Sequence, residues 1–141
     1  MSRFTIAALL MAALSAAACS NDTTTSPTTT TPTPTSVTDS FNGTITKNGA
    51  SSFAFNVSAA GAVYATLTSI ADTSVPVGLS IGVWTAATAT CSFNPSIAND
   101  SALQGSTLSA SASGVGQLCV RVYDIGKVVN PLDYQVTVVH Y

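Results

Sequence analysis

Ser80 lies between two glycines, in a pattern that some hydrolases use to present a catalytic serine. The segment GLSIG at 78–82 matches Gly-x-Ser-x-Gly, and the acids and the lone histidine follow in hydrolase order: Asp100, Asp124, Asp133 and His140. Such a serine needs a sharp turn from a strand into a helix. Here the apolar alternation continues through to Val83 and no helical spacing follows. The sequence therefore predicts a protein that is not an enzyme.

Aspartates are the other groups that could hold a ligand, in this case a metal ion. Calcium prefers several oxygen ligands, commonly clustered carboxylates, but the aspartates are scattered and no Asp-x-Asp occurs. Loops could still bring Asp100 and Asp124 together. The favoured alternative is that each aspartate caps a turn through the nearby backbone. A zinc site would need several histidine or cysteine ligands, and the chain has a single histidine. We therefore expect no metal and no cofactor.

Three aromatic side chains are candidates for binding a sugar or a protein partner. Trp84, Tyr64 and Tyr123 fall on the polar sides of their alternating segments, and small residues leave a bare strip beside Trp84. Aromatic rings next to a flat strip can stack on sugar rings or accept a protein. The simpler alternative is that Trp84 covers the edge of a sandwich, since single exposed aromatics are common in soluble proteins.

The first of three cysteines lies at a sharp change of composition. Residues 1–18 contain Arg3, an apolar segment at 4–14 and the small residues AAA before Cys19. This pattern is typical of a signal peptide and is too short for a mature membrane span. An ordinary cleavage would leave Cys19 as an unmodified N-terminus.

The sequence AAAC, followed by a polar low-complexity tract, resembles the lipobox of bacterial lipoproteins. The resemblance implies cleavage before Cys19 and a diacylglycerol on its thiol, with residues 1–18 as the lipoprotein signal peptide. Two or three acyl chains would hold the protein firmly on a membrane. Ser20 after the cysteine implies sorting to the outer membrane of the bacterial cell envelope.

Residues 19–37 are expected to form a lipidated tether. Positions 23–36 contain only Thr, Ser and Pro, which cannot bury apolar area and should stay disordered. If Cys19 carries lipid, Cys91 and Cys119 remain as a pair, and outside the cytoplasm a disulfide is expected. Such a bond would stabilise the domain by about 3–4 kcal/mol. The alternative is two free buried thiols.

Few charges are available to bind a charged partner. Charged residues make up 7% of the chain, against about 25% in a typical soluble protein. After residue 18 the only cations are Lys47, Arg121 and Lys127. Three cations cannot form a basic surface for nucleic acid, so we expect no nucleic-acid partner.

The elements that must position these residues are predicted to be short strands. Residues 38–141 alternate apolar and polar side chains between turn signals, most clearly from Val77 to Val83 and from Leu118 to Val122. This predicts an antiparallel β-sandwich of seven or eight strands. Segments 49–67 and 105–122 echo one another weakly, as two equivalent hairpins facing across a core would.

Two stretches, FNGTITKNGASSFAFNVSAAGAVYATL and YDIGKVVNPLDYQVTVVH, resemble the bacterial pre-peptidase C-terminal domain. The resemblance implies a jelly-roll-like β-sandwich that serves as an accessory module, and some relatives bind calcium. We therefore expect a lipid-anchored envelope protein whose non-catalytic sandwich binds a protein or decorates the surface. The alternative is a carbohydrate-binding module that uses Trp84 and neighbouring tyrosines on one exposed face.

Overall fold

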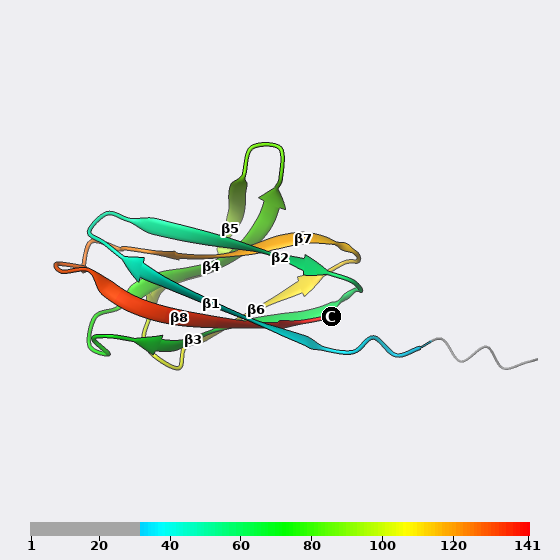
Figure 1. Cartoon of the computed structure of the whole chain (residues 1–141), viewed down its shortest axis with the longest axis horizontal. Helices are drawn as coiled ribbons and strands as arrows, with labels where there is room; N and C mark the ends of the chain where they lie inside the picture. The colour runs from blue at the N-terminus through cyan, green and yellow to red at the C-terminus, as the bar shows by residue number, and fades with distance from the viewer. Residues whose placement is uncertain (1–31) are drawn as a thin grey trace, which may run out of the picture. The chain divides into compact units, whose positions relative to one another are not determined.

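The structure of the protein is a computed structural model that describes residues 32–141. These residues form eight antiparallel strands and no helix that could span a membrane (Figure 1). The strands are β1 (Val37–Ile45), β2 (Ala50–Val57), β3 (Gly61–Ile70), β4 (Val77–Thr85), β5 (Thr90–Ala102), β6 (Thr107–Ala112), β7 (Gly116–Tyr123) and β8 (Leu132–His140). The signal peptide, Cys19 and most of the tether lie outside the described residues.

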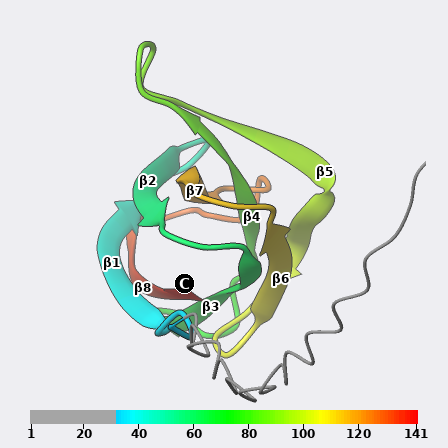
Figure 2. The ribbon, with the colours of Figure 1, turned by 90° about the vertical axis from the view of Figure 1, so that its right-hand side faces the viewer.

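The strands form two four-stranded sheets that enclose one core (Figure 2). One sheet, here called sheet A, has the order β1-β8-β3-β6, and the other, sheet B, has the order β2-β7-β4-β5. Among the described strands, β4 and β5 are the only consecutive pair that lie side by side in one sheet; every other connection crosses from one sheet to the other. This is the jelly-roll arrangement, so the predicted fold class is confirmed.

The internal echo has a different structural origin from the one expected. Segments 49–67 and 105–122 are not hairpins, because β2 and β3 belong to different sheets, as do β6 and β7. Each segment is an arch that connects the two sheets. The arches pair with each other, β2 with β7 and β3 with β6, so the similar sequences occupy equivalent places on the two sides of the core.

The core is built from the apolar side of the alternation. Long inward-facing residues of β3 and β8, such as Leu67 and Val136, are fully buried against β4 and β7 residues such as Leu79 and Val120. Their outward neighbours are mostly hydroxyl residues; for example, Thr66 and Thr107 bond to each other across β3 and β6 at 2.9 Å. Burial of one face per strand is what fixes the register.

Strand β5 was not anticipated, because its sequence does not alternate. Its pairing with β4 is interrupted between Ser80 and Gly82, where β5 inserts extra residues that include Pro95. Asn94 closes this bulge as its Oδ1 accepts a hydrogen bond from the backbone N–H of Ser96, at 3.0 Å. A bulged edge strand tolerates proline, which cannot donate to a ladder.

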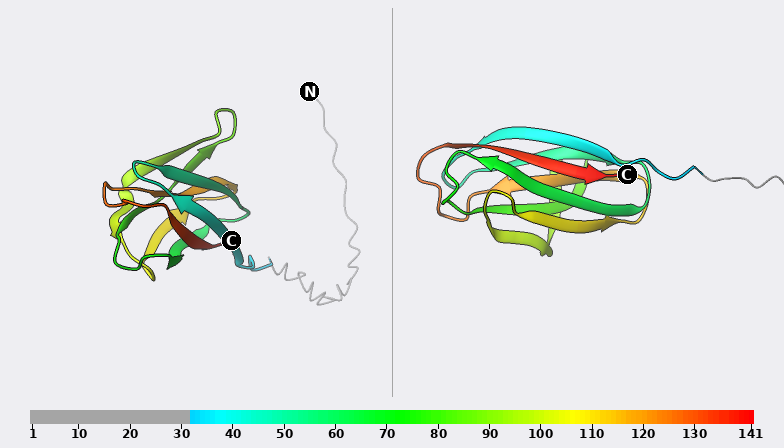
Figure 3. Two further views of the ribbon diagram at one scale, coloured as in Figure 1. Left: turned by 60° about the vertical axis from the view of Figure 1, so that its left-hand side comes forward. Right: turned by 90° about the horizontal axis from the view of Figure 1, so that it is seen from below.

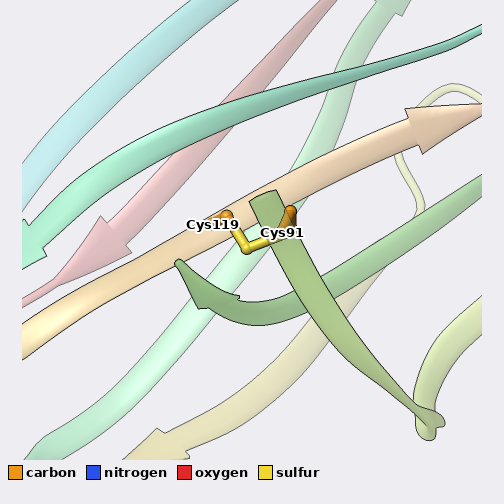
Figure 4. Close-up of a disulfide and its surroundings, with 2 residues drawn as sticks. All are labelled: Cys91 and Cys119. Carbon is orange, nitrogen blue, oxygen red and sulfur yellow. A yellow bond between two sulfur atoms is a disulfide. The ribbon is translucent and has the colours of Figure 1, made fainter. Parts of the chain in front are cut away.

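The predicted disulfide between Cys91 and Cys119 is confirmed (Figure 4). The Cα atoms are 5.8 Å apart, within the usual range for a disulfide. Cys119 is fully buried on β7 and Cys91 lies at the start of β5. The bond therefore ties the β4–β5 hairpin to a third strand of sheet B.

The start of β1 and the end of β8 lie side by side at one end of the sandwich (Figure 3). Val37 at the start of β1 pairs with His140 at the end of β8. Residues 32–36, the described end of the Thr/Ser/Pro tract, lead directly into β1. The connecting segments at the opposite end of the sandwich, such as the loop after β7, are therefore far from the start of β1.

Candidate binding site

Ser80 and His140 are not close to each other. Ser80 belongs to sheet B and faces away from the core, whereas His140 belongs to sheet A and points into it, against the ring of Phe55 at 5.1 Å. The Nε2 atom of His140 lies 3.0 Å from Oδ2 of Asp39. The GLSIG segment lies inside the continuous strand β4, so the turn that a catalytic serine requires does not form there.

Asp124 holds the loop that follows β7. Its Oδ1 atom accepts hydrogen bonds at 2.8–2.9 Å from the backbone N–H groups of Val128, Lys127 and Gly126, and its Oδ2 accepts one from Asn48 at 2.8 Å. The bond from Val128, supported by the other three, lowers the pKa of the Asp124 carboxyl. This matches the turn-capping role considered from the sequence, since both oxygens bind the backbone.

Replacing Asp124 with Ala should lower the free energy of unfolding by about 1–2 kcal/mol at pH 7, the typical cost of losing a capping carboxylate. Because the folded-state pKa is lowered, the contribution is present above the unfolded-state pKa of about 3.9 and is lost as pH falls through the folded-state value. Urea titrations at pH 7 and pH 3 should therefore show a smaller difference between variant and parent at pH 3. Asp72→Ala is the comparison, because the pKa of the exposed Asp72 carboxyl is also lowered, but by hydrogen bonds to Ser74 alone, so its loss should be smaller at both pH values. A difference that is equal at both pH values would contradict the assignment.

Asp100 has a different partner from Asp124. It accepts a short hydrogen bond from the hydroxyl of Tyr123. Burial, together with this bond, raises the pKa of Tyr123 to about 12, so the phenol stays protonated at neutral pH. Within residues 32–141 no three His, Cys, Asp or Glu side chains come close enough to hold a metal ion. The two carboxylates considered for calcium are thus engaged separately.

The three aromatic candidates do not form one surface. Tyr64 is 46% exposed on the outer face of sheet A, where its neighbours across the strands are Val139 and Ser109. Trp84 and Tyr123 both belong to sheet B, but Trp84 lies near the hairpin end of β4 while Tyr123 pairs with Gly78 near its start. Tyr64 therefore lies on the opposite side of the sandwich from Trp84 and Tyr123.

Tyr123 instead belongs to a cluster with Arg121 and Phe93 on the outer face of sheet B. The ring centroids of Phe93 and Tyr123 are 6.1 Å apart. The guanidinium carbon of Arg121 lies 5.3 Å from the centroid of Phe93 and 5.5 Å from that of Tyr123. Both distances are within cation–π range, so the two rings hold the arginine in place.

The disulfide and two glycines explain why this cluster forms. Phe93 and Arg121 each lie two residues after a half-cystine, so they project on the same side of their strands as the linked cysteines. At Gly82 the backbone of β5 approaches so closely that a Cβ would lie 2.3 Å from the carbonyl oxygen of Ser92. At Gly78 a Cβ would lie 2.2 Å from the ring of Tyr123, which packs over the bare backbone.

The cluster contains unused hydrogen-bond donors. The side chain of Arg121 forms no hydrogen bond or ion pair with any residue of 32–141, although a guanidinium has five N–H donors. Its neighbour across β4, Ser80, is fully buried and its hydroxyl has no partner among the same residues. Neither Phe93 nor Arg121 was singled out from the sequence, yet their equal offset from the two cysteines was a usable signal.

Val83 lines an apolar hollow next to this cluster, and Phe93 is part of the lining of the same hollow. Val83 continues the apolar alternation of β4 but is 59% exposed, because β4 leaves the sandwich there to form the hairpin. The hollow, of about 330 Å³, is lined mainly by apolar side chains that include Ile81, Ile97 and Leu118. Its presence shows that the core is less completely covered near β5 than elsewhere in sheet B.

No family model matches this sequence, and no curated protein matches it either. The resemblances to bacterial lipoproteins and to the pre-peptidase C-terminal domain therefore stay predictions.

Proposed function

We propose that the protein is a lipid-anchored component of the bacterial cell envelope, attached through Cys19 to the outer membrane. Its sandwich acts as a non-catalytic binding module. The observation that carries this proposal is the position of the boundary: the Thr/Ser/Pro tract continues to residue 36, and β1 begins at Val37. A tract without apolar side chains between Cys19 and the first strand is suited to hold a folded body away from a membrane.

The side chains of the sandwich support binding rather than catalysis. The groups that could act on a substrate are each engaged in structure, as with His140 at Asp39 and Asp124 at the backbone. In contrast, the donors of Arg121 are unused at the surface of a rigid, disulfide-linked sheet. A surface of this kind favours recognition without chemical change.

Producing the full chain in a diderm bacterium tests the anchor. We expect the parent protein to partition with the membrane fraction and the Cys19→Ser variant to be released into the soluble fraction, because the thiol that carries the acyl chains is gone. Mass spectrometry of the mature N-terminal peptide should show an acylated Cys19. An unmodified thiol at Cys19, or equal partitioning of both proteins, would refute the anchor.

A further inference from the structure

One end of the sandwich carries exposed apolar side chains, and we infer that this end docks on the surface of a lipid bilayer. It is the end where β1 starts at Val37, and we call it the tether end (Figure 3). Gly116 at the start of β7 pairs with Val57. The next residue, Ser58, donates its backbone N–H to the carbonyl oxygen of Tyr141 at 2.7 Å. The loop between β6 and β7 therefore lies at the tether end as well.

Large apolar side chains are exposed at the tether end. Those that are at least 45% exposed are Val37, Tyr64, Val83 and Val115. Val115 belongs to the loop between β6 and β7 and lines a hollow of about 340 Å³ together with Trp84 and Leu118. Trp84 is the single tryptophan of the chain. Aliphatic side chains beside a tryptophan are typical of protein surfaces that insert into the interfacial region of a bilayer.

Charged side chains are concentrated at the opposite end of the sandwich. Among residues 32–141 the tether end has only Asp39 as an aspartate or a cation, and its Oδ2 lies 3.0 Å from Nε2 of His140. The charged residues at or near the opposite end are Lys47, Asp72, Asp100, Asp124, Lys127 and Asp133. Charged groups lose favourable hydration when they approach lipid. The tether end is therefore the end that can meet a bilayer at the lowest cost.

Exposed valine alone does not make a docking surface. Val129, in the loop after β7, is 82% exposed, but it lines a hollow together with Asp72 and Lys127. Contact of this loop with lipid would bring both charges to the membrane. Val115 has no such neighbour among the residues that line its hollow. The difference between the two valines is what assigns the membrane contact to one end.

The inference rests on the proposed function for the closeness of the membrane. A few exposed side chains bind a bilayer weakly, but a tether converts docking into an intramolecular step at high effective concentration. The Thr/Ser/Pro tract limits how far the sandwich can move from the membrane, and the apolar end determines which side meets the lipid. Docking in this way leaves the cluster of Arg121, Phe93 and Tyr123 on sheet B free to bind a partner.

Fluorescence of Trp84 on vesicles tests the inference. The mature chain is coupled through the thiol of Cys19 to a maleimide lipid in phosphatidylcholine vesicles, and Cys91 and Cys119 do not react because they form a disulfide. Emission is compared between ordinary vesicles and vesicles whose acyl chains are brominated near the headgroup, since bromine quenches tryptophan on contact. We expect quenching of the parent. Val115→Asp should lower the ratio of docked to undocked protein about tenfold, which corresponds to about 1.4 kcal/mol, and restore most of the emission.

Val129→Asp is the matched control, because it adds the same charge at a valine that is 82% exposed, against 83% for Val115. It should be quenched like the parent. Equal quenching of the two aspartate variants would overturn the inference, as would a parent with equal emission in both kinds of vesicle. Protection of Trp84 from acrylamide, relative to the Cys19→Ser chain in solution, without quenching by bromine would overturn the bilayer in favour of contact between copies of the chain. Because the maleimide lipid supplies the anchor, these outcomes are independent of whether Cys19 is acylated in cells.

Discussion

Removing the disulfide by changing both Cys91 and Cys119 to Ala lowers the free energy of unfolding by about 3–4 kcal/mol, the largest effect that we expect from any side-chain change described here. The two cysteines are 28 residues apart, and the bond restricts a loop of that size in the unfolded chain. The measurement is a urea titration of the double variant against the oxidised parent.

The change should also loosen the contact between Phe93 and Arg121, because the disulfide holds the start of β5 against β7. Cys19→Ser provides the control, since it removes a thiol outside the sandwich and should leave the unfolding midpoint unchanged. Reducing the parent with dithiothreitol should reproduce the shift of the double variant. A double variant within about 0.5 kcal/mol of the parent would show that the bond contributes little to stability.

Gly82→Ala should lower the free energy of unfolding by about 3 kcal/mol, at the upper end of the usual cost of overpacking. The added Cβ would lie 2.3 Å from the carbonyl oxygen of Ser92 and 2.8 Å from its carbonyl carbon. These are backbone atoms of the neighbouring strand, so the clash can be relieved only by moving β5 away from β4. The clash at Gly78 involves the side chain of Tyr123, which can rotate, and should therefore cost less.

Gly114→Ala is the matched control for Gly82→Ala. A Cβ at Gly114 would meet no atom within 4 Å. Its free energy of unfolding should therefore stay within about 0.5 kcal/mol of the parent, as is usual for surface changes. If the two variants unfold at the same urea concentration, the close approach of β5 to β4 does not occur in solution.

The strands with regular alternation were predictable because one face of each is buried and the other is not. Val77, Leu79 and Ile81 alternate with small or polar residues, and all three are buried as expected. Strand β5 was missed because its bulge breaks the period of two, and the bulge is visible only against its partner β4. Val83 continues the local alternation, yet its side chain is 59% exposed because the sandwich ends before it.

The candidate site, too, was predictable from the sequence only in part. The turn-capping role of Asp124 was available from the sequence because most of its hydrogen bonds go to backbone within four residues. The grouping of Arg121 with Phe93 was not, because it depends on which strands are neighbours. The separation of Tyr64 from Trp84 likewise follows from the sheet to which each strand belongs.

By itself the sequence determined the β class, the pairing of Cys91 with Cys119 and the low number of charged side chains that a partner could meet. These features depend on local period, on cysteine number and on composition, which need no knowledge of distant contacts. Only the tertiary structure decided that Ser80 and His140 lie in different sheets and that Arg121 lies against two rings. These contacts form only when strands far apart in the chain pair within a sheet and the two sheets pack together. Burial of the apolar faces between the sheets selects which strands pair.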